Sequence, residues 1–334
     1  MTSASANRVI CLGEILFDCL ADKPEKLVSQ VAHWTRYPGG APANTACALV
    51  KLGTPTAFVG CISQDDLGQD LLQLLQDTGV DTAGVQLTAD FPTRQVYVLR
   101  SVSGDRSFAG FGESSRELGD KAPNAFADAY LNSNDLLEEL FINAEYLVIG
   151  TLELAYPQTR QAVFRALELA DKHYLKVLLD VNHREMFWLD STEAKPLIQQ
   201  LWQYVDFLKL AQEEAQWLFD THDAGAICYR LGSLEGVVVT DGAEKVSYCI
   251  SEQEGQVKPF AVEVKDTTGA GDAFLAGLIH QLCQTKLTSL NNPETVRQII
   301  TYACAVGSLT ATKEGAISAQ PTAKEVAAFL QKNS

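Results

Sequence analysis

A glycine-rich segment in the C-terminal third combines acidic side chains with bare backbone amides: Asp266-Thr-Thr-Gly-Ala-Gly-Asp-Ala-Phe274. Gly269 and Gly271 have no Cβ, so the backbone can approach a ligand closely, and a predicted helix follows them. The first N–H groups of a helix have no internal partner and carry the positive end of its dipole. These features predict an anion hole for a transferring phosphoryl group, beside which Asp272 can accept a proton from a hydroxyl.

The same segment has a simpler interpretation, because an aspartate after a glycine-rich turn is also a common N-cap of a helix. Two better-known nucleotide motifs are excluded. The chain contains no G-x-x-x-x-G-K-[ST] segment, and Gly269-Ala-Gly271 lacks the third glycine of a dinucleotide-binding fingerprint.

A second glycine-rich segment, Pro38-Gly-Gly-Ala-Pro-Ala-Asn44, also precedes a predicted helix. Gly39 and Gly40 allow a tight turn with exposed amides, and the side-chain amide of Asn44 can both donate and accept hydrogen bonds. This combination suits the adjacent hydroxyls of a polyol, although a glycine-rich turn before a helix can be purely structural. Asp18, which follows an apolar strand, either binds such hydroxyls or caps a turn.

The elements that position these residues alternate between strand and helix. Apolar runs predict buried strands at 8–13, 56–61, 146–149, 177–180, 205–209 and 236–240. Helices are predicted over 42–52, between Asp65 and Gly79, from Pro157, through Trp217, from Pro293 and from a capping box at 322–325. Strands separated by helices of about 10–15 residues indicate an α/β fold with a parallel sheet covered on both faces.

Two segments, Phe17–Tyr37 and Thr93–Phe111, interrupt this alternation and look rich in β-strand. The second contains a predicted hairpin turn at Ser103-Gly-Asp105. We expect the two segments to form a small sheet that projects over the main domain as a lid. Two separate surface hairpins are the alternative.

Length and charge limit the class of ligand. The chain has 334 residues, with 26 Lys and Arg against 42 Asp and Glu, which gives a formal net charge of −16. This acidity argues against binding to nucleic acid or to an anionic membrane, because both use basic patches. No apolar run approaches the roughly 18 residues of a membrane-spanning helix, and no signal-peptide pattern is present. We therefore expect a cytoplasmic protein with small-molecule ligands.

The eight cysteines form no C-x-x-C pair and have no histidine at metal-ligand spacing. Buried free thiols are therefore expected rather than disulfides or a structural zinc site. The five histidines are scattered along the chain, which gives a histidine metal cluster little support.

The two glycine-rich segments, Pro38–Asn44 followed along the chain by Asp266–Phe274, resemble those of the PfkB (ribokinase-like) carbohydrate kinases. The resemblance covers essentially the whole chain. Four shorter motifs are most similar to the fructokinase branch: Glu14-Ile-Leu-Phe-Asp18, Asp180-Val-Asn-His-Arg184, Lys209-Leu-Ala-Gln-Glu-Glu214 and Thr312-Lys-Glu-Gly-Ala-Ile317. The resemblance implies a ribokinase-like, doubly wound, mostly parallel sheet flanked by helices, with a small β-sheet lid. It implies one kinase domain over residues 1–334, with lid segments at about 15–37 and 93–111.

The resemblance also assigns roles to individual residues. The residue that matches Asp272 is the general base in this family, and the amides that match Gly269, Ala270 and Gly271 stabilise the transferring phosphoryl group. The implied sugar contacts are Asp18, Gly39, Gly40, Asn44, Arg106 and Arg184. The implied nucleotide contacts are Lys209, Thr240, Gly242, Gly269, Gly271, Ala303 and Gly307. Arg106 has an equally simple interpretation as a solvated turn residue.

ATP and Mg²⁺ are the implied cofactors. Glu214 matches the family glutamate that orients Mg²⁺ through water, and Asp266 and Thr268 match a site for a monovalent cation such as K⁺. One departure from the family pattern lies nearby. The usual motif is Asn-x-x-Glu, but Ala211 stands where the asparagine is expected, which removes one polar contact near the metal.

The implied function is an ATP-dependent sugar kinase, with fructose as the favoured acceptor and fructose 6-phosphate and ADP as products. Two alternatives stay open at this point. One is a kinase of the same family for ribose, a nucleoside or 2-keto-3-deoxygluconate. The other is a catalytically inactive scaffold, against which the intact Gly269, Gly271 and Asp272 argue. Exposed edges of lid strands are compatible with a homodimer formed through the lid.

Overall fold

The computed structural model describes residues 7–23, 27–100, 106–112 and 122–333. The strands of its large sheet are β1 (Val9–Leu12), β4 (Thr56–Ser63), β5 (Val85–Thr88), β8 (Tyr146–Ile149), β9 (Lys176–Asp180), β10 (Phe207–Ala211), β11 (Gly236–Asp241), β12 (Lys245–Ile250) and β13 (Gln253–Val257). The helices are α1 (Ala41–Leu52), α2 (Asp66–Thr78), α3 (Pro157–Lys172), α4 (Ala194–Gln199), α5 (Gln212–Phe219), α6 (Ala224–Leu231), α7 (Ala270–Gln284), α8 (Pro293–Thr310) and α9 (Ala323–Asn333). Short 3-10 helices, including η2 (Ala127–Tyr130) and η5 (Leu152–Ala155), join several of these elements.

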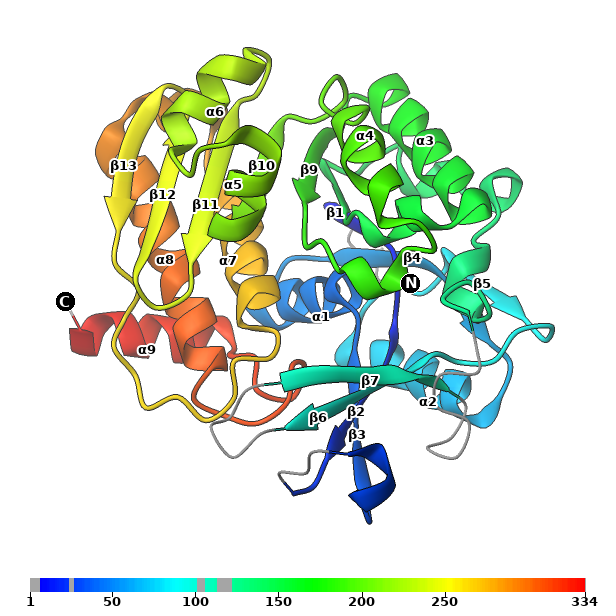
Figure 1. The fold of residues 1–334 in the computed structure, drawn as a ribbon. Helices are drawn as coiled ribbons and strands as arrows, with labels where there is room; N and C mark the ends of the chain where they lie inside the picture. Colours follow the sequence, from blue (N-terminus) through cyan, green and yellow to red (C-terminus); the bar gives the residue numbers. More distant parts are fainter. Residues whose placement is uncertain (1–6, 24–26, 101–105, 113–121, 334) are drawn as a thin grey trace, which may run out of the picture.

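The large sheet has the strand order β13-β12-β11-β10-β9-β8-β1-β4-β5 (Figure 1). Neighbouring strands are parallel from β11 through to β5. Strands β12 and β13 add an antiparallel hairpin at one edge. The predicted α/β fold with a mostly parallel sheet is therefore confirmed, whereas β5 and the β12–β13 hairpin are elements that the apolar runs did not predict.

Side chains of β1 show how the sheet is covered on both faces. Ile10 and Leu12 belong to the apolar cluster formed with α3 to α6, whereas Val9 and Cys11 belong to the cluster formed with α1, α2, α7 and α8. Successive side chains of a strand point to opposite faces, so a continuous apolar strand requires two helical layers. The two layers are visible on either side of the sheet in Figure 1.

A second sheet of four strands lies beyond the ends at which the parallel strands finish (Figure 1). It consists of β2 (Leu16–Ala21), β3 (Trp34–Gly39), β6 (Gln95–Arg100) and β7 (Arg106–Gly112), in the order β3-β2-β6-β7. The two β-rich segments thus form one sheet rather than two separate hairpins, and their role as a lid stays a prediction. The predicted turn at 103–105 lies outside the described residues.

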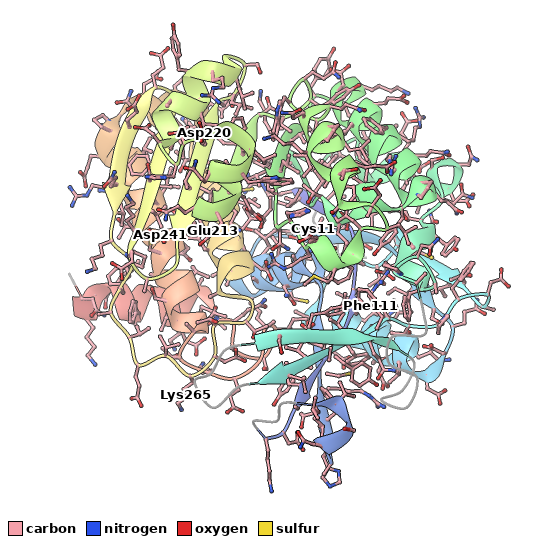
Figure 2. All side chains as sticks on the ribbon, in the orientation of Figure 1. Cys11, Phe111, Glu213, Asp220, Asp241 and Lys265 are labelled. Atoms are coloured by element: carbon pink, nitrogen blue, oxygen red, sulfur yellow. The ribbon has the colours of Figure 1, made fainter. Side chains whose placement is uncertain are left out.

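Phe111 fixes one end of the small sheet against the main domain. Phe111 belongs to β7 (Figure 2), and its ring centroid lies 5.0 Å from that of Phe187 and 6.0 Å from that of Phe126. Aromatic pairs at such distances stabilise a contact beyond the area that they bury. The small sheet is therefore packed on the domain at this end.

The cysteines of the chain are free thiols, and all of them except the half-buried Cys228 are buried, as predicted. Among the described residues, no helix combines the length and the apolar character that crossing a membrane would require.

Asp65 caps α2 and also holds the segment that leads into the small sheet. Its Oδ1 accepts the N–H of Gly68 (2.7 Å), and its carboxylate accepts both the N–H (2.8 Å) and the hydroxyl (2.6 Å) of Thr93. Burial acts to raise the pKa of Asp65, but these hydrogen bonds outweigh it and lower the pKa below its ordinary value.

Asp65→Ala is expected to lower the free energy of unfolding at neutral pH by about 1–2 kcal/mol, the usual cost of losing such a cap. Because the folded pKa is lowered, this stabilisation is present above the unfolded pKa and is lost as pH falls through the folded pKa. Urea unfolding of both proteins at several pH values checks this. An equal difference between the two proteins at neutral and at strongly acidic pH would contradict it.

Candidate active site

A cavity of about 560 Å³ lies between the small sheet and the carboxyl ends of the parallel strands. Ligands of open α/β sheets usually bind at this edge. The small sheet contributes an apolar wall to the cavity, which includes Leu16, Val96, Val98 and Phe108. Residues predicted for the site form most of the opposite wall: Asn44, Lys209, Glu214, Thr240, Asp266, Thr268, Gly269, Gly271 and Asp272.

The start of α7 has the backbone shape expected of an anion hole. Gly269 is in the left-handed region (φ 74°), and a Cβ on it would lie 2.8 Å from Cα of Ala316, so only glycine fits. The N–H of Ala270 donates to the carbonyl of Thr267 (3.2 Å), and Ala270 lies outside the cavity lining. Gly271 and Asp272, in the first turn of the helix, line the cavity, and first-turn N–H groups have no partner within the helix.

Asp272 and Asn44 join the two glycine-rich segments. The Nδ2 of Asn44 donates to Oδ2 of Asp272 (2.7 Å), although the two residues lie on different helices, α7 and α1. Burial raises the pKa of Asp272, and the hydrogen bond from Asn44 opposes part of that rise. A half-buried carboxylate with a raised pKa, oriented by an amide, is suited to act as a general base.

A buried ion pair lies next to this carboxylate. Nζ of Lys209 contacts both carboxylate oxygens of Asp180 at 2.9 Å, and the two residues are 7% and 4% exposed. Burial of the ammonium opposes its charge, but the carboxylates of Asp180 and Glu214 outweigh burial and raise the pKa of Lys209. Lys209 therefore stays charged beside the start of α7, where an anion would bind.

Glu214 is held by two backbone donors. Its Oε1 accepts the N–H of His183 and its Oε2 accepts the N–H of Ala211, both at 2.7 Å. Ala211 is the N-cap residue of α5. It stands where the family pattern has asparagine, and Glu214 accepts its backbone N–H. Burial raises the pKa of Glu214, and the negative charge of Asp180 adds to the rise.

The proposed sugar side of the cavity is built around Asp18. This residue lies on β2 and lines the cavity together with Gly40. A Cβ on Gly39 would lie 2.4 Å from Oδ2 of Asp18, and a Cβ on Gly40 (φ 105°) would lie 2.5 Å from the carbonyl oxygen of Glu14. Both glycines therefore allow the turn to pack closely against its neighbours. The exposed Arg184 also lines this cavity.

Asp266 connects the glycine-rich segment before α7 to the loop before α9 through hydrogen bonds. Its Oδ1 accepts the N–H (2.9 Å) and the hydroxyl (2.6 Å) of Thr268, and its Oδ2 accepts the N–H of Gly315 (3.1 Å). The predicted role of Asp266 and Thr268 in binding a monovalent cation stays a prediction. In the part of the chain that the structure describes, no group of three or more His, Cys, Asp or Glu residues could hold a metal ion by itself.

Three of the predicted nucleotide contacts lie away from the cavity lining. Gly242 (φ 50°) lies in the exposed turn between β11 and β12. Ala303 is fully buried in α8, and a Cβ on Gly277 of α7 would lie 3.0 Å from its Cα. Gly307 packs against the carbonyl oxygen of Ala270, beneath the anion-hole loop. Their roles stay predictions, as does that of Arg106, whose side chain is outside the described part.

Several lining residues have no counterpart among the predicted site residues. They include Glu14, Tyr37, Leu152, Asn182, Met186 and Phe187. Glu14 belongs to the motif Glu14–Asp18, and Asn182 belongs to the motif Asp180–Arg184. Their place in these two motifs was the signal that could have identified them. The apolar residues carry no such signal, because only the fold brings their separate segments of the chain to one cavity.

A carboxylate at a helix start that has the backbone shape of an anion hole, at the carboxyl edge of a mostly parallel sheet and beneath a small second sheet, is the arrangement expected of a phosphotransferase. Comparison with known proteins agrees with this class. The chain belongs to the pfkB family of carbohydrate kinases, whose sequence pattern matches residues 6–323.

Relatives and solved structures extend this result over the full chain. A probable fructokinase-3 from Arabidopsis thaliana is 31% identical over 326 residues, which cover 97% of this chain and 91% of the relative. The crystal structure of a fructokinase from Xylella fastidiosa with bound ATP has a TM-score of 0.86 at 27% identity, with 98% of each chain covered. A fructokinase double mutant from Vibrio cholerae O395, bound to fructose, ADP and potassium ion, has a TM-score of 0.82 at 28% identity, with 98% and 99% covered.

Proposed function

We propose that this protein is an ATP-dependent fructokinase, which transfers the γ-phosphoryl group of ATP to the 6-hydroxyl of D-fructose. The observation that carries the proposal is the contact between Asp272 and Asn44, which places a carboxylate of the anion-hole segment beside the predicted acceptor segment. The fructokinases among the similar proteins support fructose as the acceptor and ATP as the donor.

In the proposed reaction Asp272 accepts the proton of the 6-hydroxyl. The hydroxyl oxygen forms a bond to the γ-phosphorus while the bond between that phosphorus and the bridging oxygen of ADP breaks. The amides at the start of α7 and the ammonium of Lys209 stabilise the charge on the transferring group. Phosphoryl transfer depends mainly on positioning and charge stabilisation, which these residues supply.

Mg²⁺ would neutralise charge on the phosphate oxygens of ATP. Glu214 fits a role in its hydration shell, because the carboxylate lines the cavity and both of its oxygens already accept a backbone N–H. Contact through water needs only the remaining lone pairs of these oxygens, and Mg²⁺ in kinases usually keeps several waters. A monovalent cation at Asp266 and Thr268, closure of the small sheet as a lid, and dimerisation through the edges of β3 and β7 are parts of the same proposal.

Glu214→Gln is expected to raise the Mg²⁺ concentration needed for half-maximal rate by about tenfold, the typical effect of removing a partner from the outer shell of a metal. The KM for fructose should change little, because the proposed role of Glu214 is to orient Mg²⁺ rather than to bind the sugar. A titration of the rate with Mg²⁺ at saturating ATP and fructose measures this. An unchanged Mg²⁺ requirement would remove Glu214 from the metal shell.

The proposed acceptor is tested by coupled ADP release with ATP, Mg²⁺ and a panel of fructose, ribose, glucose, 2-keto-3-deoxygluconate and adenosine. We expect the largest kcat/KM with fructose. A larger kcat/KM with another member of the panel would keep the fold and the base but change the substrate. Absence of turnover with every acceptor would contradict the kinase proposal for this panel.

A further inference from the structure

A second acid forms part of the cavity wall near Asp18. Glu14 lies between β1 and β2, lines the cavity and is 7% exposed. Glu153, in η5, lies behind it and is 2% exposed. The backbone N–H of Glu14 donates to Oε1 of Glu153 (3.0 Å), so the two buried acids are direct neighbours.

The two carboxyl groups can satisfy each other only if they hold a proton between them. An ionised carboxylate has no donor, so a hydrogen bond between two carboxyls forms only when one of them is protonated. Oε1 of Glu14 already accepts the N–H of Ala41, and Oε2 of Glu153 is buried without a hydrogen-bond partner among the residues that the structure describes. A proton on the remaining oxygen of Glu14 would satisfy Oε2 of Glu153.

The nearby cation, Arg94, makes no hydrogen bond to this pair. The titratable groups that face it are Arg94, Asp128 and Tyr156. Nε of Arg94 donates to Oδ2 of Asp128 (2.7 Å), so these two charges compensate each other. Within the described chain, Nη1 and Nη2 of Arg94 have no hydrogen-bond partner, and the guanidinium lies among aromatic rings, 4.6 Å from the ring centroid of Phe126. Two buried negative charges on Glu14 and Glu153 would therefore repel each other, with no hydrogen bond from Arg94 to offset the repulsion.

The carboxyl of Glu14 also fixes the start of α1. The N-cap of this helix is Gly40, which has no side chain to satisfy the first N–H groups. Oε1 of Glu14 accepts the N–H of Ala41 at 2.7 Å and so replaces the missing cap. Asn44, one turn further along α1, donates to Asp272. The position of the Glu14 carboxyl thus determines where the amide that orients Asp272 lies.

We propose that Glu14 and Glu153 share one proton as a carboxyl pair, and that Glu14 is a positioning residue that holds the start of α1 and the acceptor site. The inference rests on the proposed fructokinase function. Burial raises the pKa of Glu14, and the charge of Glu153 adds to the rise. As pH rises through that raised pKa, the pair loses its proton, the two charges repel, and the start of α1 is no longer held.

Three variants test this. Glu14→Ala removes the cap and is expected to raise the KM for fructose by about tenfold, with a much smaller change in the KM for ATP. Glu14→Gln keeps an oxygen for the N–H of Ala41 and supplies an amide N–H in place of the shared proton, so it should recover most of the lost affinity. Glu153→Gln supplies a donor from the other side and should resemble Glu14→Gln.

The pH profile separates a shared proton from packing. The KM for fructose of the wild type should rise as pH increases through the raised pKa of the pair, and this rise should be absent in Glu14→Gln. Titration of Asp272 acts on kcat at the acid side, so the two effects are distinguishable. A Glu14→Gln variant as impaired as Glu14→Ala, or one that keeps the rise in KM, would overturn the proposal.

The two proposals can fail separately. If the wild type does not phosphorylate fructose, the function is wrong, and thermal unfolding still tests the pair. The melting temperature of the wild type should then be closer to that of Glu14→Gln than to that of Glu14→Ala. As pH rises, the melting temperature of Glu14→Gln should decline less than that of the wild type. Equal melting temperatures for Glu14→Gln and Glu14→Ala at every pH would contradict proton sharing.

Discussion

Replacing Asp272 with asparagine is expected to lower kcat with fructose and ATP by about 10²–10⁴-fold, the usual contribution of a general base. Asparagine keeps the size of the side chain but cannot accept the proton of the acceptor hydroxyl. The KM values for both substrates should change by less than about threefold, because the loss falls on the transition state rather than on binding. Steady-state kinetics, with ATP binding measured by calorimetry, check both parts.

Asp171→Asn is a matched control, because Asp171 is an exposed aspartate on α3, far along the chain from both glycine-rich segments. It should retain wild-type kcat. The pH profile offers a second check of the base. Since burial raises the pKa of Asp272, kcat of the wild type should fall as pH decreases through that raised pKa. A kcat for Asp272→Asn within tenfold of the wild type would exclude Asp272 as the base.

Lys209→Met is expected to lower the free energy of unfolding by about 3 kcal/mol or more, because it leaves the buried carboxylate of Asp180 without its cation. Both oxygens of Asp180 contact Nζ of Lys209 at 2.9 Å, and both residues are buried. Activity should fall as well, since the ammonium also faces the start of α7. Chemical denaturation followed by tryptophan fluorescence measures the change in stability.

The double variant Asp180→Asn with Lys209→Met is the control for this prediction. Removing both charges takes away the unpaired carboxylate, so the double variant should be more stable than Lys209→Met alone. Its activity should stay low, because the cation near the phosphoryl site is still missing. A double variant less stable than Lys209→Met would show that the pair does not act through charge compensation.

Local signals predicted helix ends well. Asp65 and Gly79 bound α2, with Asp65 accepting the N–H of Gly68 and Gly79 in the left-handed region, as the sequence suggests. Strand β13, in contrast, has the sequence Gln-Glu-Gly-Gln-Val and no apolar run. Such an edge strand forms because β12 offers it a hydrogen-bonding partner, which no local pattern reveals.

The candidate site was predictable only in part for a related reason. The two glycine-rich segments carry their own signal, and the structure brings Asn44 and Asp272 together. Ala303 and Gly307, two predicted nucleotide contacts, lie where α7 and α8 pack closely, so helix packing also explains why these residues are small. The contact between Glu14 and Glu153 depends on folding across a long stretch of chain, so neither residue alone signals a carboxyl pair.

The most direct test of phosphoryl transfer in this cavity follows both products of one reaction. Purified protein is incubated with ATP, Mg²⁺ and fructose, and ³¹P NMR quantifies sugar phosphate and ADP over time. We predict that fructose 6-phosphate and ADP form in equal amounts and that both form at least about 100-fold more slowly with Asp272→Asn. ADP without sugar phosphate, or phosphate on another hydroxyl of fructose, would contradict the placement of the acceptor's 6-hydroxyl at Asp272.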